Sequence, residues 1–207
     1  FSICEWGWGK PYNWGAKAGN LWRTTPDIRP WWWWIKLIYN HTVKLYKYSS
    51  AGHFNDPDML EVGNGKLTYD QNVSHFSLWC MMNSPLILGN DLRSMSEGVK
   101  KIITNKNLIA INQDALAMQA KRVKRGAIDV LAKPLADGGT AICFFNKTSH
   151  SAGISYNLNK LCSDDYVSLK AASSYALCDQ WTGETLNTNG KLKLKLKKYQ
   201  CKVYIIK

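Results

Sequence analysis

The sequence predicts two structural parts: an α/β part over residues 1–117 and an antiparallel β-sandwich over residues 118–207. Before Ala117, strand-like and helix-like segments alternate, as they do in βα units. After Ala117, short runs rich in β-branched and aromatic residues follow one another, with turn signals between them. With 45% hydrophobic and 20% charged residues, the composition is that of a globular protein.

The α/β part begins with two short strands and continues with four helices. Apolar runs predict buried strands at Phe1–Cys4 and Pro85–Gly89, and Leu21–Thr24 is a further strand. The segment 51–59 is rich in Gly, Asn, Asp and Pro, which indicates a strand end or a loop. Helical spacing or composition predicts helices at Pro30–Tyr46, Thr68–Met82, Ser96–Thr104 and Lys106–Asn112.

The second part contains a series of short predicted strands. They lie around Val123 and at Ile128–Leu131, Ala141–Phe145, Ala152–Tyr156, Tyr166–Leu169, Ser174–Leu177 and Lys191–Ile206. In Lys191–Lys198, leucine and lysine alternate with a period of two. This pattern predicts a strand with leucine facing inward and lysine outward.

The basic charge is concentrated in the second part. The chain has 27 Lys and Arg against 15 Asp and Glu, and residues 118–207 hold 15 of the basic and 6 of the acidic groups. The lysine stripe is either a solvated face that discourages edge-to-edge pairing or a polyanion-binding surface. We favour the first, because arginine is scarce there and no aromatic stacking platform is interleaved. We therefore expect no nucleic-acid partner.

Several other classes of site and location are excluded by pattern. The longest apolar stretch, Pro30–Tyr39, is broken by Lys36 and is too short for a membrane span, so no membrane partner is expected. No CxxC, His/Cys cluster or phosphate loop is present, so we expect no metal and no cofactor. The six cysteines are too sparse for a disulfide scaffold, and their pairing is left open. Because the chain opens at Phe1, we expect further residues before it.

Carboxylates in Gly- and Trp-rich settings are the candidate chemical groups. They are Glu5, Asp27, Asp56, Asp58 and Asp91. Nearby tryptophans suit stacking on sugar faces, and paired carboxylates suit glycoside hydrolysis. On an extended segment Asp56 and Asp58 would point to one face, about 6.6–7 Å apart, which makes them one candidate pair.

The order of the motifs closely resembles that of glycoside hydrolase family 27, the family of α-galactosidases and α-N-acetylgalactosaminidases. The resemblance rests on Cys4–Gly7, Trp22–Ile28, Gly52–Gly65, Ser74–Trp79, Asn83–Leu92 and Ile109–Asp114. It implies that residues 1–117 are the second half of a (β/α)₈ barrel, strands five to eight, with Phe1–Cys4 as strand five and Pro85–Gly89 as strand eight. Residues 118–207 would be the antiparallel β domain of that family.

The resemblance also assigns roles to individual residues. Asp27 matches the general acid/base of a retaining α-galactosidase, and Arg23 matches a ligand of the sugar hydroxyls. Cys4, Trp6 and Met59 match residues that line the galactose pocket, and Glu5 lies in the loop that discriminates at the sugar 2-position. The resemblance places Asp56 and Asp58 at structural strand-end positions, which argues against the catalytic pair.

A retaining enzyme also needs a carboxylate nucleophile, and its motif is absent from this chain. The expectation is therefore an α-galactosidase piece that is inactive alone and requires the N-terminal half of the barrel as its partner. The alternatives are a non-catalytic carbohydrate- or polyanion-binding remnant, or a relative acting on β-L-arabinopyranosides or α-N-acetylgalactosaminides. The oligomeric state is not predicted.

Two features depart from the family pattern. Pro26 precedes the acid/base position and restricts Thr25 to extended geometry. The run Trp31–Trp34 cannot face a core with all four rings from one helical turn, so at least one ring should be exposed. This run is interpreted as an interaction patch, an aromatic sugar subsite or a sequence error. Family members are often secreted or lysosomal, so we expect an extracellular or lysosomal/vacuolar compartment, where the sequons at Asn40, Asn72 and Asn146 would matter.

Overall fold

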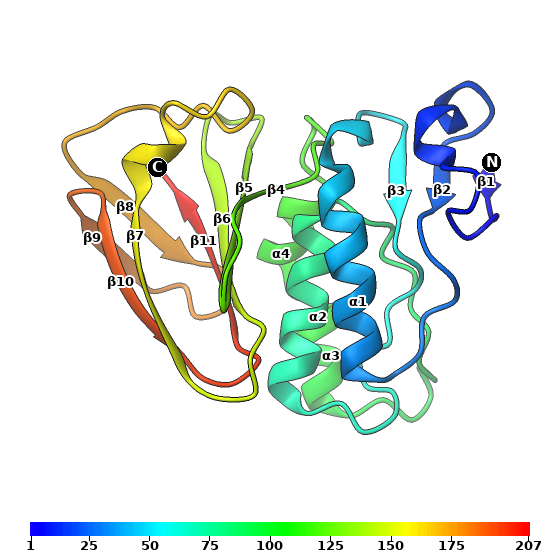
Figure 1. Cartoon of the computed structure of the whole chain (residues 1–207). Helices are drawn as coiled ribbons and strands as arrows, with labels where there is room; N and C mark the ends of the chain where they lie inside the picture. Colours follow the sequence, from blue (N-terminus) through cyan, green and yellow to red (C-terminus); the bar gives the residue numbers. More distant parts are fainter. The chain divides into compact units, whose positions relative to one another are not determined.

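The N-terminal unit contains a short parallel sheet in the computed structural model, which describes residues 1–207. Its strands pair in the order β1-β2-β3, with Trp22 opposite both Ile3 and Asn55. The strands are β1 (Ser2–Ile3), β2 (Leu21–Arg23) and β3 (Phe54–Asp56). They lie side by side in blue to cyan in Figure 1, and this unit extends from Phe1 to Ala120.

Four helices accompany this sheet, at the positions that the sequence predicts. They are α1 (Trp32–Thr42), α2 (Tyr69–Met81), α3 (Glu97–Ile103) and α4 (Lys106–Asn112). The start of α2 is fixed by a capping box, in which Thr68 N–H donates to Gln71 Oε1 and Gln71 N–H donates to Thr68 Oγ1. A 3₁₀ segment, Val43–Tyr48, continues α1.

The apolar run Pro85–Gly89 was predicted to be a buried strand, and this prediction is wrong. The run forms only an isolated parallel bridge between Leu60 and Leu88, and Ile87 is half exposed. Its backbone pairs with the single residue Leu60, which donates to Ile87 O and accepts from Gly89 N. An apolar run records a preference for burial, but a strand also needs a partner on the neighbouring backbone.

The C-terminal unit, Lys121–Lys207, is an antiparallel sandwich, as predicted. A six-stranded sheet, ordered β4-β5-β6-β11-β8-β9, packs against the pair β7 and β10. Phe144 and Ile142 from the larger sheet share one core with Tyr156 and Leu192 from the pair. The strands are β4 (Lys121–Lys124), β5 (Ile128–Pro134), β6 (Thr140–Asn146), β7 (Ala152–Asn157), β8 (Tyr175–Asp179), β9 (Thr185–Thr188), β10 (Lys191–Leu196) and β11 (Cys201–Ile206).

The lysine stripe has the arrangement that its alternation predicts. In β10, Lys191, Lys193 and Lys195 are exposed, while Leu192 and Leu196 are buried. The strand pairs with β7 alone, so it is an edge strand. Exposed lysines on such an edge discourage pairing with a second chain, which fits the solvated-face interpretation.

Two strand assignments in this unit need correction. Tyr166–Leu169 is a turn rather than a strand, because the Asp164 carboxylate accepts hydrogen bonds from Tyr166 N and Val167 N and curls the backbone. The strand β9 was not predicted, since its four residues are polar or exposed and show no alternation. Both errors concern short segments whose conformation is set by turn chemistry.

The boundary between the units lies between Ala120 and Lys121, and the boundary expected at Ala117 lies three residues earlier.

All six cysteines are free, although Cys143 Sγ and Cys201 Sγ are 3.1 Å apart in the buried part of β6 and β11. None of the helices combines the length and the apolar character needed to cross a membrane.

Candidate active site

The candidate site is built at the carboxyl ends of β2 and β3. Arg23 is the last residue of β2 and Asp56 is the last residue of β3, and the two strands are parallel partners. Parallel strands bring their carboxyl ends to the same edge, where the side chains that follow them can converge. The backbone continues the pairing here, because Thr24 N–H donates to Asp56 O.

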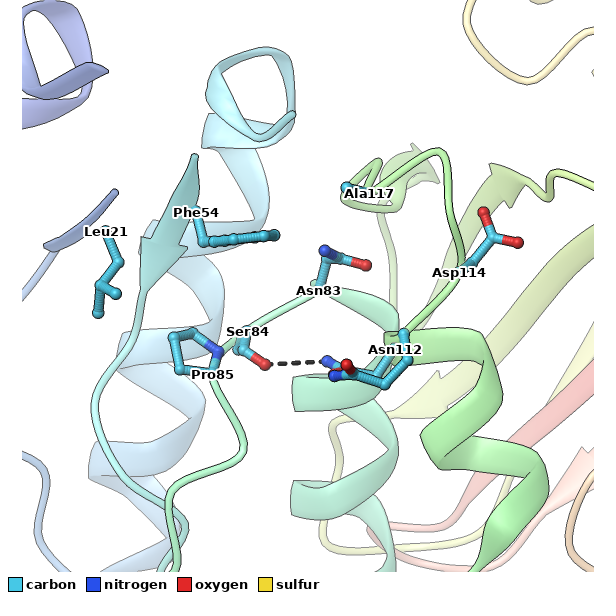
Figure 2. A pocket seen from close by; sticks show the side chains of 9 residues that line it. Leu21, Phe54, Asn83, Ser84, Pro85, Asn112, Asp114 and Ala117 are labelled. Atoms are coloured by element: carbon cyan, nitrogen blue, oxygen red, sulfur yellow. Dashed lines mark hydrogen bonds between the residues drawn. The ribbon is translucent and has the colours of Figure 1, made fainter. Parts of the chain in front are cut away.

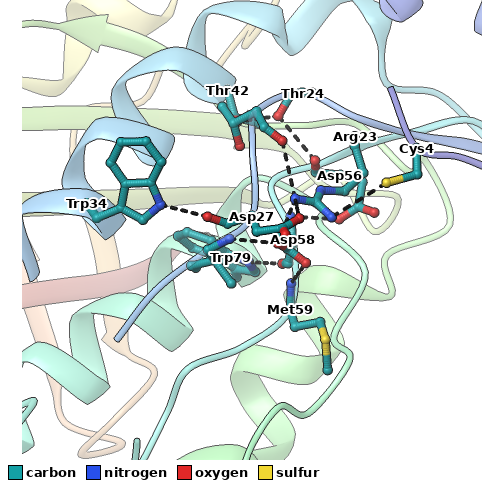
Figure 3. Close-up of polar contacts among 12 residues, drawn as sticks. Cys4, Arg23, Thr24, Asp27, Trp34, Thr42, Asp56, Asp58, Met59 and Trp79 are labelled. Carbon is teal, nitrogen blue, oxygen red and sulfur yellow. Dashed lines mark hydrogen bonds and ion pairs between the residues drawn. The ribbon is translucent and has the colours of Figure 1, made fainter. Parts of the chain in front are cut away.

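Arg23 is the centre of a buried polar cluster, drawn in Figure 3. Its Nη2 lies 2.6 Å from Asp58 Oδ2 and 3.2 Å from Asp27 Oδ1. Its Nη1 donates to Cys4 Sγ at 3.9 Å. One guanidinium therefore joins residues that follow β1, β2 and β3. Four residues that the sequence analysis considered for the site meet there, namely Cys4, Arg23, Asp27 and Asp58.

Asp58 holds the cluster together as a structural residue. Its Oδ2 accepts from Ile28 N–H as well as from Arg23, and its Oδ1 accepts from Met59 N–H. Its carbonyl accepts the indole N–H of Trp79. The residue adopts a left-handed backbone conformation, φ 79°, which an aspartate tolerates when such local hydrogen bonds fix it.

Asp56 is also committed to the backbone. Its Oδ1 accepts from Asp58 N–H at 2.8 Å, and burial raises the pKa of its carboxyl group, an effect that this hydrogen bond and Arg23 partly offset. Both carboxylates of the pair weighed from the sequence are thus buried and engaged with main-chain donors. This geometry disfavours a catalytic dyad of Asp56 and Asp58.

Asp27 differs from these neighbours in its exposure. Its side chain is 53% exposed, against 11% for that of Asp58. Its backbone is nevertheless held, because Trp34 Nε1 donates to Asp27 O at 2.8 Å. Its carboxylate accepts a hydrogen bond from Arg23 Nη2. An accessible carboxylate on a fixed backbone has the geometry that a proton donor to a bound substrate requires.

The other implied site residues lie close to this cluster, with different surroundings. Cys4 and Met59 are exposed, and both contact the cluster, Cys4 through Arg23 and Met59 through Asp58. The Glu5 carboxylate turns back into its own loop, where both oxygens accept from Gly9 N–H. Trp6 is partly exposed, and its left-handed backbone conformation aims it at the pocket beside Asp27.

Sequence reasoning missed two residues that position the cluster. Trp79 was placed on a helix by its spacing, but nothing in the sequence indicated that its indole binds the carbonyl of Asp58. Trp34 was noted only as part of a tryptophan run, whereas it holds the backbone of Asp27. Both indoles are donors only, and a buried indole N–H needs an acceptor, which was the one available signal.

A larger pocket, of about 330 Å³, lies away from the cluster. It is lined by Leu21 and Phe54, the first residues of β2 and β3, and by residues after α2 and α4 (Figure 2). Asn112 Nδ2 donates to Ser84 O along its wall. Because it opens at the amino ends of the strands, this pocket is at the wrong edge of the sheet for barrel chemistry. No group of three His, Cys, Asp or Glu side chains converges as a metal site would require.

Comparison with known proteins identifies the relatives of this chain. Residues 7–114 match the family described as alpha galactosidase A, and residues 125–206 match the alpha galactosidase C-terminal beta sandwich domain. Alpha-galactosidase 2 of Arabidopsis thaliana is 39% identical over 208 residues, an alignment that covers all of this chain and 51% of that protein. The chain thus spans about half the length of the curated relatives it matches.

Solved structures agree with this match. The crystal structure of alpha-galactosidase I from Mortierella vinacea superposes with a TM-score of 0.92 at 25% identity, covering 100% of this chain and 57% of that one. A β-L-arabinopyranosidase from Geobacillus stearothermophilus superposes with a TM-score of 0.84 at 22% identity, covering 95% and 47%, and this likeness concerns the fold alone. The chain is therefore a member of the α-galactosidase family, glycoside hydrolase family 27, and contains a part of its barrel together with its C-terminal β-sandwich.

Proposed function

We propose that this chain supplies the general acid/base and part of the sugar site of a retaining α-galactosidase. The observation that supports this proposal is the unequal treatment of three carboxylates around Arg23. Asp56 and Asp58 are buried and bound by backbone donors, while Asp27 is fixed at its backbone and half exposed at its carboxyl group. Only Asp27 combines position with access to a substrate.

In the proposed mechanism, Asp27 protonates the glycosidic oxygen as the bond to the galactosyl carbon breaks. A second carboxylate, on a segment that this chain does not contain, attacks the opposite face and forms a covalent galactosyl ester. Asp27, now ionised, then removes a proton from water, which hydrolyses that ester with overall retention. Retaining enzymes hold their two carboxyl groups about 5–5.5 Å apart, so the missing group would come from the N-terminal half of the barrel.

Arg23 has a dual role in this proposal. Its contact with Asp27 holds that carboxylate in place beside the substrate. By resemblance to the family, its guanidinium, which Asp58 holds in place, would also bind a sugar hydroxyl. Cys4, Trp6 and Met59 would line the galactose, and the Glu5 loop would set the discrimination at the 2-position.

The test uses the complete protein that contains this chain and the variant Asp27→Asn. Turnover of an α-galactosyl disaccharide should fall about 10²–10⁴-fold, the usual contribution of general acid–base catalysis. A galactoside with an activated leaving group should retain more activity, and added azide should yield an α-galactosyl azide. Asp165→Asn, a change at an exposed carboxylate of the β-sandwich, is the matched control and should leave turnover intact. Wild-type turnover by Asp27→Asn would exclude the assignment.

The alternative, a non-catalytic carbohydrate-binding chain, predicts sugar binding without turnover in the complete protein.

We further propose the extracellular or lysosomal/vacuolar compartment. Of the three sequons, those at Asn72 and Asn146 are buried, with side chains that bond Gly63 N, Leu67 O, His150 O and Lys197 O. Glycosylation is therefore expected at Asn40 alone, and the intact mass after glycosidase treatment measures it.

A further inference from the structure

A tryptophan-walled pocket of about 310 Å³ lies against Asp27, and most of its walls lie outside the proposed galactose site. Its walls include Trp6, Trp31, Trp33, Trp34 and Arg29, with Asp27 at one side. The volume is at the lower end of the range for small-molecule sites, which fits a single ring better than a macromolecular segment. The inference below rests on the proposed role of Asp27.

The indoles form an ordered surface rather than a loose cluster. Trp31 and Trp33 stack with ring centroids 5.8 Å apart and planes inclined by 15°. Trp33 meets Trp34 edge to face at 5.3 Å. Trp34 is in turn fixed by its hydrogen bond to Asp27 O, so the position of the aromatic wall is tied to that of the proposed acid.

These rings do not serve the core of the protein. From the first turns of α1, Trp32 and Ile35 face inward and are buried, whereas the side chains of Trp31 and Trp33 remain 53% and 58% exposed. Contiguous exposed aromatic area of this kind marks a surface that a ligand or another protein segment covers.

The composition of the pocket favours a pyranose ring. One face of a pyranose presents C–H groups that pack on an indole, and its edge presents hydroxyls that need polar partners. Arg29 and Asp27 supply a donor and an acceptor at the margin of the indole wall. A purely apolar occupant would cover the Arg29 guanidinium without offering it an acceptor.

The position of the pocket determines which ring of the substrate it would hold. The carboxylate of Asp27 contacts Arg23, whereas its carbonyl contacts Trp34, and Figure 3 shows these partners on opposite sides of Asp27. An acid that protonates a glycosidic oxygen lies between the sugar on one side and the leaving group on the other. We propose that Trp31, Trp33, Trp34 and Arg29 form a subsite for the pyranose ring of the leaving group, with Trp6 at its border with the galactose site.

The experiment measures binding ring by ring. The complete protein that contains this chain, with Asp27→Asn to block turnover, is mixed with the disaccharide α-galactosyl-(1→6)-glucose, and saturation transferred from the protein to each sugar ring is read by ligand-observed NMR. We expect saturation of the glucose ring when the tryptophans are unchanged. In Trp33→Ala this signal should fall at least fivefold, whereas the signal of the galactosyl ring should persist, and Trp33→Phe should recover part of the loss.

Trp8→Ala is the matched control, because Trp8 is 79% exposed on the neighbouring loop and does not line the pocket. It should leave both rings unchanged. Circular dichroism of Trp33→Ala should retain the wild-type helix content, since the ring lies outside the buried face of α1. The melting temperature should fall only by the loss of its contacts with Trp31 and Trp34.

Each outcome bears on the proposal separately from the proposed function. A glucose signal that is absent when the tryptophans are unchanged, or that Trp33→Ala leaves unchanged, overturns the subsite. A parallel sample contains both 4-nitrophenol and glucose. If the protein saturates 4-nitrophenol and not glucose, the pocket holds an aromatic leaving group and the pyranose assignment is overturned. A saturated glucose ring beside an unsaturated galactosyl ring supports the subsite and counts against the galactose site of this chain.

Discussion

Arg23 Nη2 lies 2.6 Å from Asp58 Oδ2, and both side chains are almost completely buried. The same nitrogen lies 3.2 Å from the exposed carboxylate of Asp27. The shorter contact belongs to the carboxylate that has no access to substrate. The Arg23–Asp58 pair is therefore the buried part of the site, and Asp27 is the carboxylate that faces solvent.

Replacing Asp58 by Asn should unfold the protein more readily, because it removes the negative partner of a buried guanidinium. Breaking such a pair costs about 3–5 kcal/mol, whereas loss of an exposed pair costs about 0–1 kcal/mol. Asp91→Asn is the matched control, since it also removes a carboxylate from an arginine, here the exposed Arg93. Urea denaturation measures both. Equal losses of stability in the two variants would contradict the structural role of Asp58.

His75 should make the protein sensitive to mild acid. It is fully buried, its Nε2 accepts from Glu61 N–H, and burial lowers the pKa of its imidazole to about 3. In the unfolded chain its pKa is about 6.5, so between these values the unfolded state binds more protons than the folded state. Stability therefore rises with pH in this window and is lost as pH falls, by about 2 kcal/mol from pH 7 to pH 5.

The variant His75→Gln tests this expectation, because a glutamine oxygen can still accept from Glu61 N–H and does not titrate. The difference in unfolding free energy between pH 7 and pH 5 should shrink by about 2 kcal/mol relative to the wild-type chain. His150→Gln, at an exposed histidine, should leave the pH dependence as it is. An unchanged slope in His75→Gln would mean that another group governs the acid response.

The fold was largely predictable because its signals are local. A capping residue, Thr68, and apolar spacing predict the helix α2. Strict alternation of leucine and lysine predicts the strand β10. The failures, Pro85–Gly89 and Tyr166–Leu169, are segments whose state depends on a backbone partner or on the side chain of a preceding aspartate. Neither dependence is visible in an apolar run.

The sequence named several residues that the structure brings together around Arg23, but it did not indicate the contacts between them. Arg23 and Asp27 lie four residues apart, and the resemblance to a known family singles them out. The bond from Arg23 to Asp58 crosses from β2 to β3 and requires Asp58 to take a left-handed conformation that its residue type does not demand. The wall of exposed indoles beside Asp27 was predicted only to the extent that some ring of Trp31–Trp34 had to be exposed.

Asn55 should be among the least replaceable residues of the N-terminal unit. Its side chain accepts from Trp22 Nε1 and donates to Leu45 O and Gln119 Oε1, all in the buried interior. Asn55→Ala removes the acceptor of Trp22 Nε1 and the donor to Leu45 O and Gln119 Oε1. Each buried polar group that loses its partner costs about 1–3 kcal/mol of stability. The expected loss is at least 3 kcal/mol by urea denaturation, against about 0.5 kcal/mol or less for Asn13→Ala on the surface. A loss below 1 kcal/mol would show that water replaces the amide.

Asp129 should play the corresponding part in the sandwich. Its fully buried carboxylate contacts Arg122 Nη1 at 3.1 Å and Lys147 Nζ at 2.9 Å and accepts from Gly126 N–H. Asp129→Asn leaves two cations facing a neutral amide and should cost about 3–5 kcal/mol.

Hydrogen–deuterium exchange of peptides from β5 and β6 measures this loss within the unit itself, as faster exchange of amides that are protected in the wild-type chain. Asp165→Asn, on the exposed surface of the same unit, is the control and should leave that protection unchanged, because no buried cation depends on its charge. If the β5 and β6 amides stayed protected in Asp129→Asn, the cations would have found solvent or another acceptor, and the sandwich would not depend on this buried carboxylate.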